Sequence, residues 1–534
     1  QLPLSHSEEK IPWPIADLSL QTAAFTKPYI IYPRPDSETD NGGNPVARHR
    51  WGHADMAYEI PLYARAGRAF YNVVIDTANT NAALTGITVT KGGLGSTGYK
   101  WFKVFIPQTT MALLSTGVEY GISTIFTDQA GKIMRCWWSF QMEANPLDHF
   151  FFVNNAELVN GNGTFSSPFN SFDQTGWLDN GGGASSAGKI MVVMEGNSQT
   201  PSSEYSKTAL THGSWLISSS QFPVGIINIP SEQPVIDLNG EVPVIGYLDS
   251  TANDVFMYGI KCINGWEMPN DAGDGRGAFI TGGFNSVSPN RCVVSHCVFD
   301  TVNSWPTVTN FNNAALTIGS RGSTCENHVY ADLEFTNFVG SGITNIGSTI
   351  MWMGQKYGLL DNHTVSNYGT TNGGMRQLVF LKHSTTDSTV RRIIAKDNVT
   401  LLTTTGNGIV MSDESSPVGY LRENMEFCYN DLMMQPGYAR NVISIIRIDD
   451  TGIGPVHIYR NTAVRGGITI SSNMPITLKA NDHTVANNLV GSDTTTETDY
   501  QTVITDYQTD TTLLTDTYLT SQTLERGEVG HEIT

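Results

Sequence analysis

The feature that most constrains the fold is a repeat of short apolar segments, each paired with a turn-forming Asn or Asp. After Asn145 such segments recur every 26–36 residues, and most are accompanied by a second apolar strand. No single unit can bury its apolar face alone, so the units must stack on one another. The segments are KCING at 261, HCVFDTV at 296, ADLEFTNFV at 331, DNHTVSNYG at 361, KDNVTLL at 396, YNDLMM at 429, RNTAV at 460 and ANNLVG at 486, with the second strands AALTIGS, STIMWMG, QLVFLKHS, NGIVMSDE, VISIIRIDD and GITISS.

Stacked units of this kind predict a parallel β-helix. Parallel strands about 4.8 Å apart satisfy the backbone groups of each rung with those of the rungs above and below. Helical solenoids are excluded because the units lack a period of 3.6 residues. A β-propeller is the alternative, but its blades are longer and carry Trp-Asp or Gly-His signatures that are absent here. Asn suits the turns because it tolerates left-handed backbone and can hydrogen-bond from rung to rung.

Composition and turn signals divide the chain into four regions. Of the 534 residues, 40% are hydrophobic, only 15% are charged and 52 are Gly, which favours strands and turns. Residues 1–50 read as a Pro-rich extended arm, 51–145 as a small β-sandwich with a hairpin turn at 128–131, 146–492 as the β-helix and 493–534 as polar C-terminal rungs or a cap. The predicted fold class is therefore all-β.

Charge and cysteine content exclude several classes of partner. The net charge of −19 and pI near 5.0 oppose nonspecific binding to nucleic acid or to an anionic membrane. No window holds some 18 uncharged apolar residues, so membrane insertion is not expected. Because the chain begins at Gln1, removal of an upstream leader stays open. The six cysteines show no paired CxxC and are expected to be buried thiols.

The stretch NGNGTFSSPFNSF at 160–172 explains how such a coil begins. It resembles the Gly-x-Gly-Thr-x-x-x-Pro-Phe entry segment of right-handed parallel β-helices, among them bacteriophage tailspikes and secreted polysaccharide lyases and hydrolases. The resemblance implies a turn at 162–164, with Phe169 and Phe172 plugging the end of the coil. A solenoid needs such a cap because its first rung otherwise exposes apolar side chains and unpaired strand edges.

A second resemblance covers roughly residues 28–145. The segments KPYIIYPRPD, RHRWGHADMAYEIPL, IFTDQAGKIMRCWWSFQM and FFFVNN are similar to an immunoglobulin-like module that precedes β-helices in phage and marine bacterial proteins. Together the two resemblances imply an extracellular or virion-surface spike, expected to be a homotrimer, that binds a bacterial polysaccharide and attaches to other virion proteins through its N-terminal arm. Whether it also depolymerises the glycan stays open.

Two other functions are weighed beside the spike. One is a secreted polysaccharide lyase or glycoside hydrolase, and the other is a non-enzymatic virion or filament component in which the coil is a stiff spacer. The arm favours the spike, because it is suited to attachment to another protein and not to catalysis.

Charged residues of three consecutive second strands form the best catalytic candidate. Stacking of those strands brings carboxylates to within about 5–10 Å, the range that glycoside hydrolysis requires. We expect Asp413 or Glu414 to act as acid and Asp449 as base, with His383 as the base of a lyase alternative. Solvated or cross-paired charges are the alternative interpretation. The residues expected to bind substrate are Lys382, Arg447, Asp450 and Trp352, although aromatic rings more often fill the interior.

No metal or cofactor is expected. Asp271 and Asp274 in NDAGDGRG could wrap a calcium ion, but the loop lacks the full calcium pattern and a solvated loop is preferred. His49, His53 and Asp55 could form a metal cluster, yet their place at a domain start favours hydrogen-bonded packing.

Overall fold

The N-terminal part of the chain forms two antiparallel sheets. The computed structural model describes residues 29–32, 51–65, 71–92, 101–128, 133–170, 189–196 and, between 215 and 491, the strands of the coil with their shorter corners. The first sheet has the order β1-β2-β5-β4 and the second β3-β6-β7. Their bounds are β1 Tyr29–Tyr32, β2 Tyr58–Arg65, β3 Tyr71–Ile75, β4 Thr88–Gly92, β5 Trp101–Ile106, α1 Gln108–Met111, β6 Glu119–Asp128 and β7 Ile133–Gln141.

The two sheets share one core, as the alternation of their strands predicts. In β5 every second residue is buried, so Phe102, Val104 and Ile106 face inward, where they join Phe126 and Trp138 of the other sheet. The predicted β-sandwich is thus present, and β6 and β7 pair as the hairpin signal at 128–131 indicated. The likeness to an immunoglobulin-like module stays a prediction.

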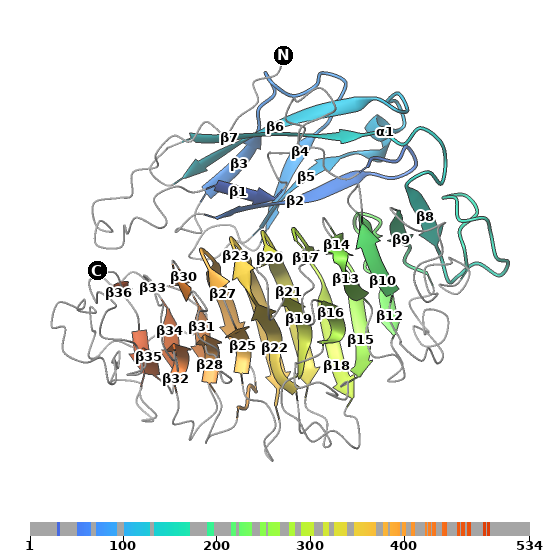
Figure 1. Ribbon diagram of the computed structural model, residues 1–534. Helices are drawn as coiled ribbons and strands as arrows, with labels where there is room; N and C mark the ends of the chain where they lie inside the picture. Colours follow the sequence, from blue (N-terminus) through green and yellow to red (C-terminus); the bar gives the residue numbers. More distant parts are fainter. Residues whose placement is uncertain are drawn as a thin grey trace.

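The rest of the described chain is a parallel β-helix, confirming the fold class. In Figure 1 the rungs follow one another from green to orange, with the sandwich along one flank. One face has the order β10-β13-β16-β19-β22-β25-β28-β32-β35, every pair parallel. Its strands are β10 Trp215–Ser219, β13 Gly246–Ala252, β16 Gly277–Gly282, β19 Asn313–Gly319, β22 Ile346–Met353, β25 Gln377–Lys382, β28 Asn407–Met411, β32 Asn441–Ile445 and β35 Gly467–Ile470.

The face that meets the sandwich is built from the first strand of each rung. It contains β8 Phe150–Val153, β9 Ile190–Val193, β11 Val224–Asn228, β14 Val255–Tyr258, β17 Val293–Ser295, the first parts of β21 Val329–Phe338, β24 Leu359–Tyr368 and β27 Thr389–Ala395, then β30 Met425–Cys428, β33 Val456–Tyr459 and β36 Thr484–Ala486. Along β8, β9 and β14, alternate side chains pack into the coil or against the sandwich. In β14, for example, Met257 joins the coil interior and Phe256 joins the sandwich core.

The third face continues each rung after a corner. It contains β12 Val235–Asp237, β15 Lys261–Trp266, β18 Val298–Asn303, the second parts of β21, β24 and β27, then β31 Asp431–Met433, β34 Thr462–Val464 and β37 Leu489–Gly491. A short ladder, β20 Cys325–Glu326, β23 Gln355–Lys356, β26 Thr385–Thr386 and β29 Arg422–Glu423, closes the remaining side.

Left-handed corner residues stack in columns along the coil. At the corner between the face that meets the sandwich and the third face, Asp332 and Asn362 both have φ of 54°. Asn362 donates a hydrogen bond to Asp332 at 2.5 Å, although the two residues are 30 positions apart in the sequence. At the next corner Asn367 donates to Asn337 at 2.7 Å and accepts from Asn398 at 2.8 Å. Asn is favoured there because it adopts positive φ at low cost and its amide bridges neighbouring rungs. The predicted role of Asn in the turns is confirmed.

The entry segment caps the first rung, as the first resemblance implied. Gly163 has φ of 86°, the left-handed turn expected at 162–164, and the Thr164 N–H donates to Asn162 Oδ1 at 3.2 Å. Phe169 bonds the backbone of Phe152 and packs against Phe151, inside the coil. Phe172 lies outside the described residues. The segment thus covers the rung end that would otherwise be open.

One predicted boundary differs from the structure. β1 lies within the range predicted as an arm, yet it pairs antiparallel with β2, so its residues belong to the sandwich. The predicted C-terminal region, 493–534, lies outside the described residues. Among the described residues no helix is long and apolar enough to cross a membrane. Cys262, Cys292, Cys297, Cys325 and Cys428 are buried thiols, as expected.

Candidate functional site

The strands that precede the predicted catalytic residues do lie on three consecutive rungs. β25, β28 and β32 are neighbours, with Leu381 beside Met411 and Met411 beside Ile445. The backbone of Lys382 ends β25, but nothing is described of its side chain. The other charged candidates lie outside the described residues and stay predictions: His383, Asp413, Glu414, Arg447, Asp449 and Asp450.

Trp352, which was expected to bind substrate, lies inside the coil. Its ring is fully buried in the coil interior and lies 5.8 Å from the ring of Tyr330. The alternation of β22 turns Trp352 inward with Ile350, so the large ring fills the interior. The expectation that this side chain stacks on a sugar is therefore wrong.

Of the residues considered as metal ligands, some lie outside the described residues and others can be placed. His49, Asp271 and Asp274 lie outside the described residues. His53 Nε2 is 3.5 Å from Glu143 Oε2, and its Nδ1 is 3.8 Å from Asp55 Oδ2, which makes a polar contact at the start of the sandwich. Within the described part of the chain, no three His, Cys, Asp or Glu side chains are grouped to hold a metal ion.

A cleft between the sandwich and the coil is a candidate site formed by described residues. Its volume is about 600 Å³, and it is open to solvent. From the sandwich come Glu59 of β2 and Trp101 and Lys103 of β5, and from the coil come Tyr258 of β14 and His296, which follows β17. We call this feature the junction cleft. Its remaining lining residues include Asn228, Glu232, Asp332, Glu334 and Asn362.

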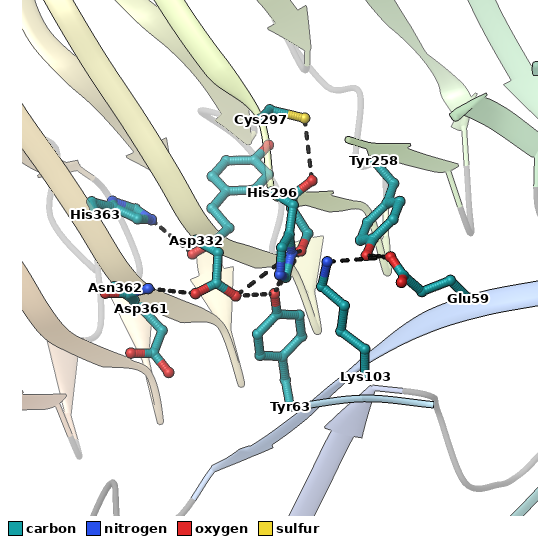
Figure 2. A network of polar contacts seen from close by, with 12 residues as sticks. Glu59, Tyr63, Lys103, Tyr258, His296, Cys297, Asp332, Asp361, Asn362 and His363 are labelled. Atoms are coloured by element: carbon teal, nitrogen blue, oxygen red, sulfur yellow. Dashed lines mark hydrogen bonds and ion pairs between the residues drawn. The ribbon is translucent and has the colours of Figure 1, made fainter. Parts of the chain in front are cut away.

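An ion pair and two rings form one wall of the junction cleft. Lys103 Nζ lies 3.2 Å from Glu59 Oε1, and both side chains are largely buried. The same ammonium sits 4.8 Å from the centre of the Trp101 ring and 5.3 Å from that of Tyr258, whose hydroxyl donates to Glu59. Charge, aromatic faces and hydrogen bonds thus fix this wall across the domain junction. Figure 2 shows Glu59, Lys103 and Tyr258 meeting there.

A buried polar network forms the back of the cleft. Tyr63, from β2, donates to Asp332 Oδ2 at 2.5 Å and lies 2.5 Å from Ser295 Oγ. Ser295 Oγ is 2.7 Å from His296 Nδ1, and Asn362 donates to Asp332 Oδ1. Figure 2 shows Tyr63 reaching from the sandwich toward side chains on adjacent rungs of the coil. The network fixes the sandwich on the coil.

Burial dominates the ionisation of this network. It raises the pKa of Asp332 to about 6, although the bonds from Tyr63 and Asn362 favour the charged carboxylate. Burial, together with the Lys103 ammonium, holds the pKa of His296 well below its usual value, so the imidazole is neutral. Ser295 and Asp332 both approach Nδ1 of His296, so the group lacks the geometry of a Ser-His-Asp triad, in which they bond opposite ring nitrogens.

A buried ion cluster supports the network from the next rungs. Asp361 accepts hydrogen bonds from Arg391 at 2.8 and 3.0 Å and from Arg392 at 2.5 and 2.6 Å. All three side chains are almost fully buried. Asp361 of β24 pairs with Ala331 of β21, the residue before Asp332. The ion cluster therefore fixes the corner that carries Asp332 and lines the cleft.

Glu143 is a second carboxyl whose charge is opposed by burial. Its Oε1 accepts the backbone N–H of His149 at 2.7 Å and of Phe150 at 3.2 Å, while Oε2 faces His53. Burial raises its pKa to about 7 from an ordinary value of 4.5. Because folding raises the pKa of Glu143, its protonated form contributes stability that is fully present below pH 4.5. That contribution is lost as the pH rises through 7.

Replacing Glu143 by Gln is therefore expected to stabilise the protein above pH 7. Gln keeps an oxygen for the two backbone amides and a donor for His53, but it does not titrate. The gain over the native protein should grow from near zero below pH 4.5 to as much as about 3 kcal/mol above pH 7. Urea unfolding at a series of pH values measures it, with Glu157→Gln at an exposed position as control. A gain that is independent of pH would contradict this account.

The junction cleft was not predicted from the sequence. HCVFDTV and ADLEFTNFV were recognised as repeat units, and stacking them places His296 beside Asp332. The spacing of the repeat units, however, does not indicate which face of the coil the sandwich covers. The contributions of Glu59, Trp101 and Lys103 therefore had no signal in the repeat.

Comparison with known proteins adds a distant structural likeness. Neither a protein family nor a curated protein matches the chain. Among solved structures, it is similar to a family 28 exopolygalacturonase of Yersinia enterocolitica, at 9% sequence identity and a TM-score of 0.31, over 86% of this chain and 94% of that one. The fold assignment stands on the parallel pairing of the chain's own strands.

Proposed function

We propose that the protein is a tailspike-like spike, on a virion or another surface outside the cell, that binds a bacterial polysaccharide in the junction cleft. The observation that carries the proposal is the cleft itself: a solvent-open groove on a β-helix, in which the partly exposed Trp101 ring lies beside fixed polar side chains. Aromatic faces stack on sugar rings, and the polar groups around them bind hydroxyls. The homotrimer and attachment through the N-terminal arm belong to the same proposal.

The geometry of the described residues favours binding over cleavage. Asp332 has a pKa suited to a general acid, yet both of its oxygens accept hydrogen bonds from Asn362 and Tyr63 within the protein. A catalytic acid needs an oxygen directed at the substrate. Glycoside hydrolase or lyase activity would thus rest on the predicted residues from His383 to Asp450, which lie outside the described residues.

Polysaccharide binding can be tested with a panel of bacterial surface glycans and two matched variants. Trp101→Ala removes a ring from the cleft and is expected to weaken binding about tenfold or more, equivalent to about 1.4 kcal/mol. Trp137→Ala makes the same change on β7, outside the cleft, and should leave affinity unchanged. Biolayer interferometry on immobilised glycan measures both. Equal losses, or no binding to any glycan, would move the function to a purely structural component.

Cleavage is tested in the same samples by release of reducing ends or unsaturated products. Native protein is compared with the double variant Asp413→Asn, Asp449→Asn. Turnover that disappears in the double variant would establish an enzyme acting through those residues. Equal turnover by both proteins would discard them, and no turnover by either would support a binding protein.

A further inference from the structure

We propose that the junction cleft selects glycans that carry free amino groups, as glucosamine units do, over glycans of uronic acids. This inference rests on the proposed function and names the chemical class of its ligand. Four carboxylates, Glu59, Glu232, Asp332 and Glu334, line the cleft, and Lys103, the single ammonium among its described lining residues, offsets only Glu59, with which it pairs. The chain as a whole carries a net charge of −19. A cationic ligand is therefore attracted and an anionic one repelled.

Lys103 does not offset this selection. Its ammonium pairs with Glu59 at 3.2 Å and lies over the rings of Trp101 and Tyr258, so it is already neutralised. A uronate would have to displace Glu59 to reach it. The wall also shows how the cleft accommodates an ammonium group, between a carboxylate and aromatic faces, and that is the environment that a ligand amine requires.

Two buried polar atoms at the cleft have no hydrogen-bond partner among the described residues: Asn228 Oδ1 and His296 Nε2. Asn228 is only 7% exposed, and its amide nitrogen donates to the carbonyl oxygen of Glu232 at 2.5 Å, so the orientation of the amide is fixed with Oδ1 left over. A buried acceptor without a donor is costly, and a ligand N–H would remove that cost.

Counting hydrogens shows that His296 Nε2 is an acceptor as well. The Tyr63 hydroxyl hydrogen goes to Asp332, so the 2.5 Å contact between Tyr63 and Ser295 requires the hydrogen of Ser295. The 2.7 Å contact from Ser295 Oγ to His296 Nδ1 then requires a hydrogen on Nδ1. A neutral imidazole has one N–H, which leaves a lone pair on Nε2. Both unpartnered atoms thus call for a donor, which an ammonium group supplies and a carboxylate does not.

The inference is tested with three oligosaccharides of equal length: a glucosamine hexamer, its N-acetylated counterpart and a galacturonate hexamer. Calorimetry at low ionic strength should show the glucosamine hexamer binding about tenfold or more tightly than the neutral one, with no binding of the galacturonate. The preference should shrink at about 1 M salt, where screening is strong. Equal affinity for the amine and N-acetyl forms, or tighter binding of galacturonate, would overturn the inference while leaving the proposed function in place.

Variants separate the cleft from general attraction to an acidic protein. Glu334→Gln, at an exposed position in the cleft, is expected to weaken binding of the glucosamine hexamer about three- to tenfold, whereas Glu157→Gln, exposed elsewhere, should not. Trp101→Ala retains every charge and should also weaken binding. If both carboxylate variants act alike and Trp101→Ala has no effect, the binding is surface attraction and the inference is wrong. If no hexamer and no bacterial glycan binds, the proposed function fails too.

Discussion

Replacing Asp361 by Ala is expected to lower the free energy of unfolding by about 3–5 kcal/mol. The change removes the one carboxylate to which the buried guanidinium groups of Arg391 and Arg392 each donate two hydrogen bonds. Burial alone would raise the pKa of Asp361, but the two guanidinium charges outweigh it and lower the pKa, so the carboxylate is charged above pH 3.8. Urea unfolding followed by circular dichroism measures the loss.

The control for Asp361 is an exposed carboxylate. Asp148→Ala, which removes a surface hydrogen bond to Asn145, should cost no more than about 1 kcal/mol. Combining Asp361→Ala with Arg391→Met should recover part of the loss, because one of the two buried charges that Asp361 balances is then removed. A loss for Asp361→Ala no larger than that for Asp148→Ala would mean that solvent reaches the two guanidinium groups.

Replacing Trp352 by Ala is expected to cost about 3–5 kcal/mol of stability, and to leave glycan affinity of the folded protein unchanged. The ring is among the largest fully buried side chains of the described residues, and it packs so closely on Gly358 that a methyl group there would approach it to 2.6 Å. Removing it opens a cavity that the stacked rungs cannot close. Thermal and urea unfolding measure the loss, and interferometry measures affinity.

Trp352→Phe distinguishes packing from a role in binding. Its indole N–H is buried and has no hydrogen-bond partner among the described residues, so Phe loses volume but also removes an unsatisfied donor. The cost should be well below that of the alanine variant. A variant that stays stable but loses glycan affinity would restore the sequence-based expectation that this ring binds sugar.

The coil could be predicted from the sequence because its corners have a demanding backbone. Positive φ at Asn264, Asn337, Asn362 and Asn398 selects Asn, and apolar strands lie on either side. The sequence did not show which corner of the rung each Asn occupies. Asn362 belongs to the corner column of Asp332, and Asn398 belongs to the column of Asn367. Both corners require left-handed backbone, so both favour Asn. The repeat units chosen from the sequence therefore mix the two corners.

The site could not be predicted because its walls come from two domains. Strands of the face that meets the sandwich, such as β14, are buried on both sides, so the outward Phe256 is apolar like the inward Met257. Without alternation, the sequence gives no sign of a covering domain. The charged candidates after β25, β28 and β32 were easier to notice, since charge is rare in this chain. Their stacking was inferred correctly for the strands, and their function stays a prediction.

Hydrogen–deuterium exchange with a bound glycan tests the central claim most directly. If the polysaccharide lies in the junction cleft, exchange should slow in the segments 101–105, 228–233 and 258–259, which contribute lining residues from both domains. Peptides covering 379–382 and 409–411 should be unchanged. Slowed exchange confined to the segments after β25, β28 and β32, with none at the junction, would contradict the proposed site and return the function to the charged residues from Lys382 to Asp450.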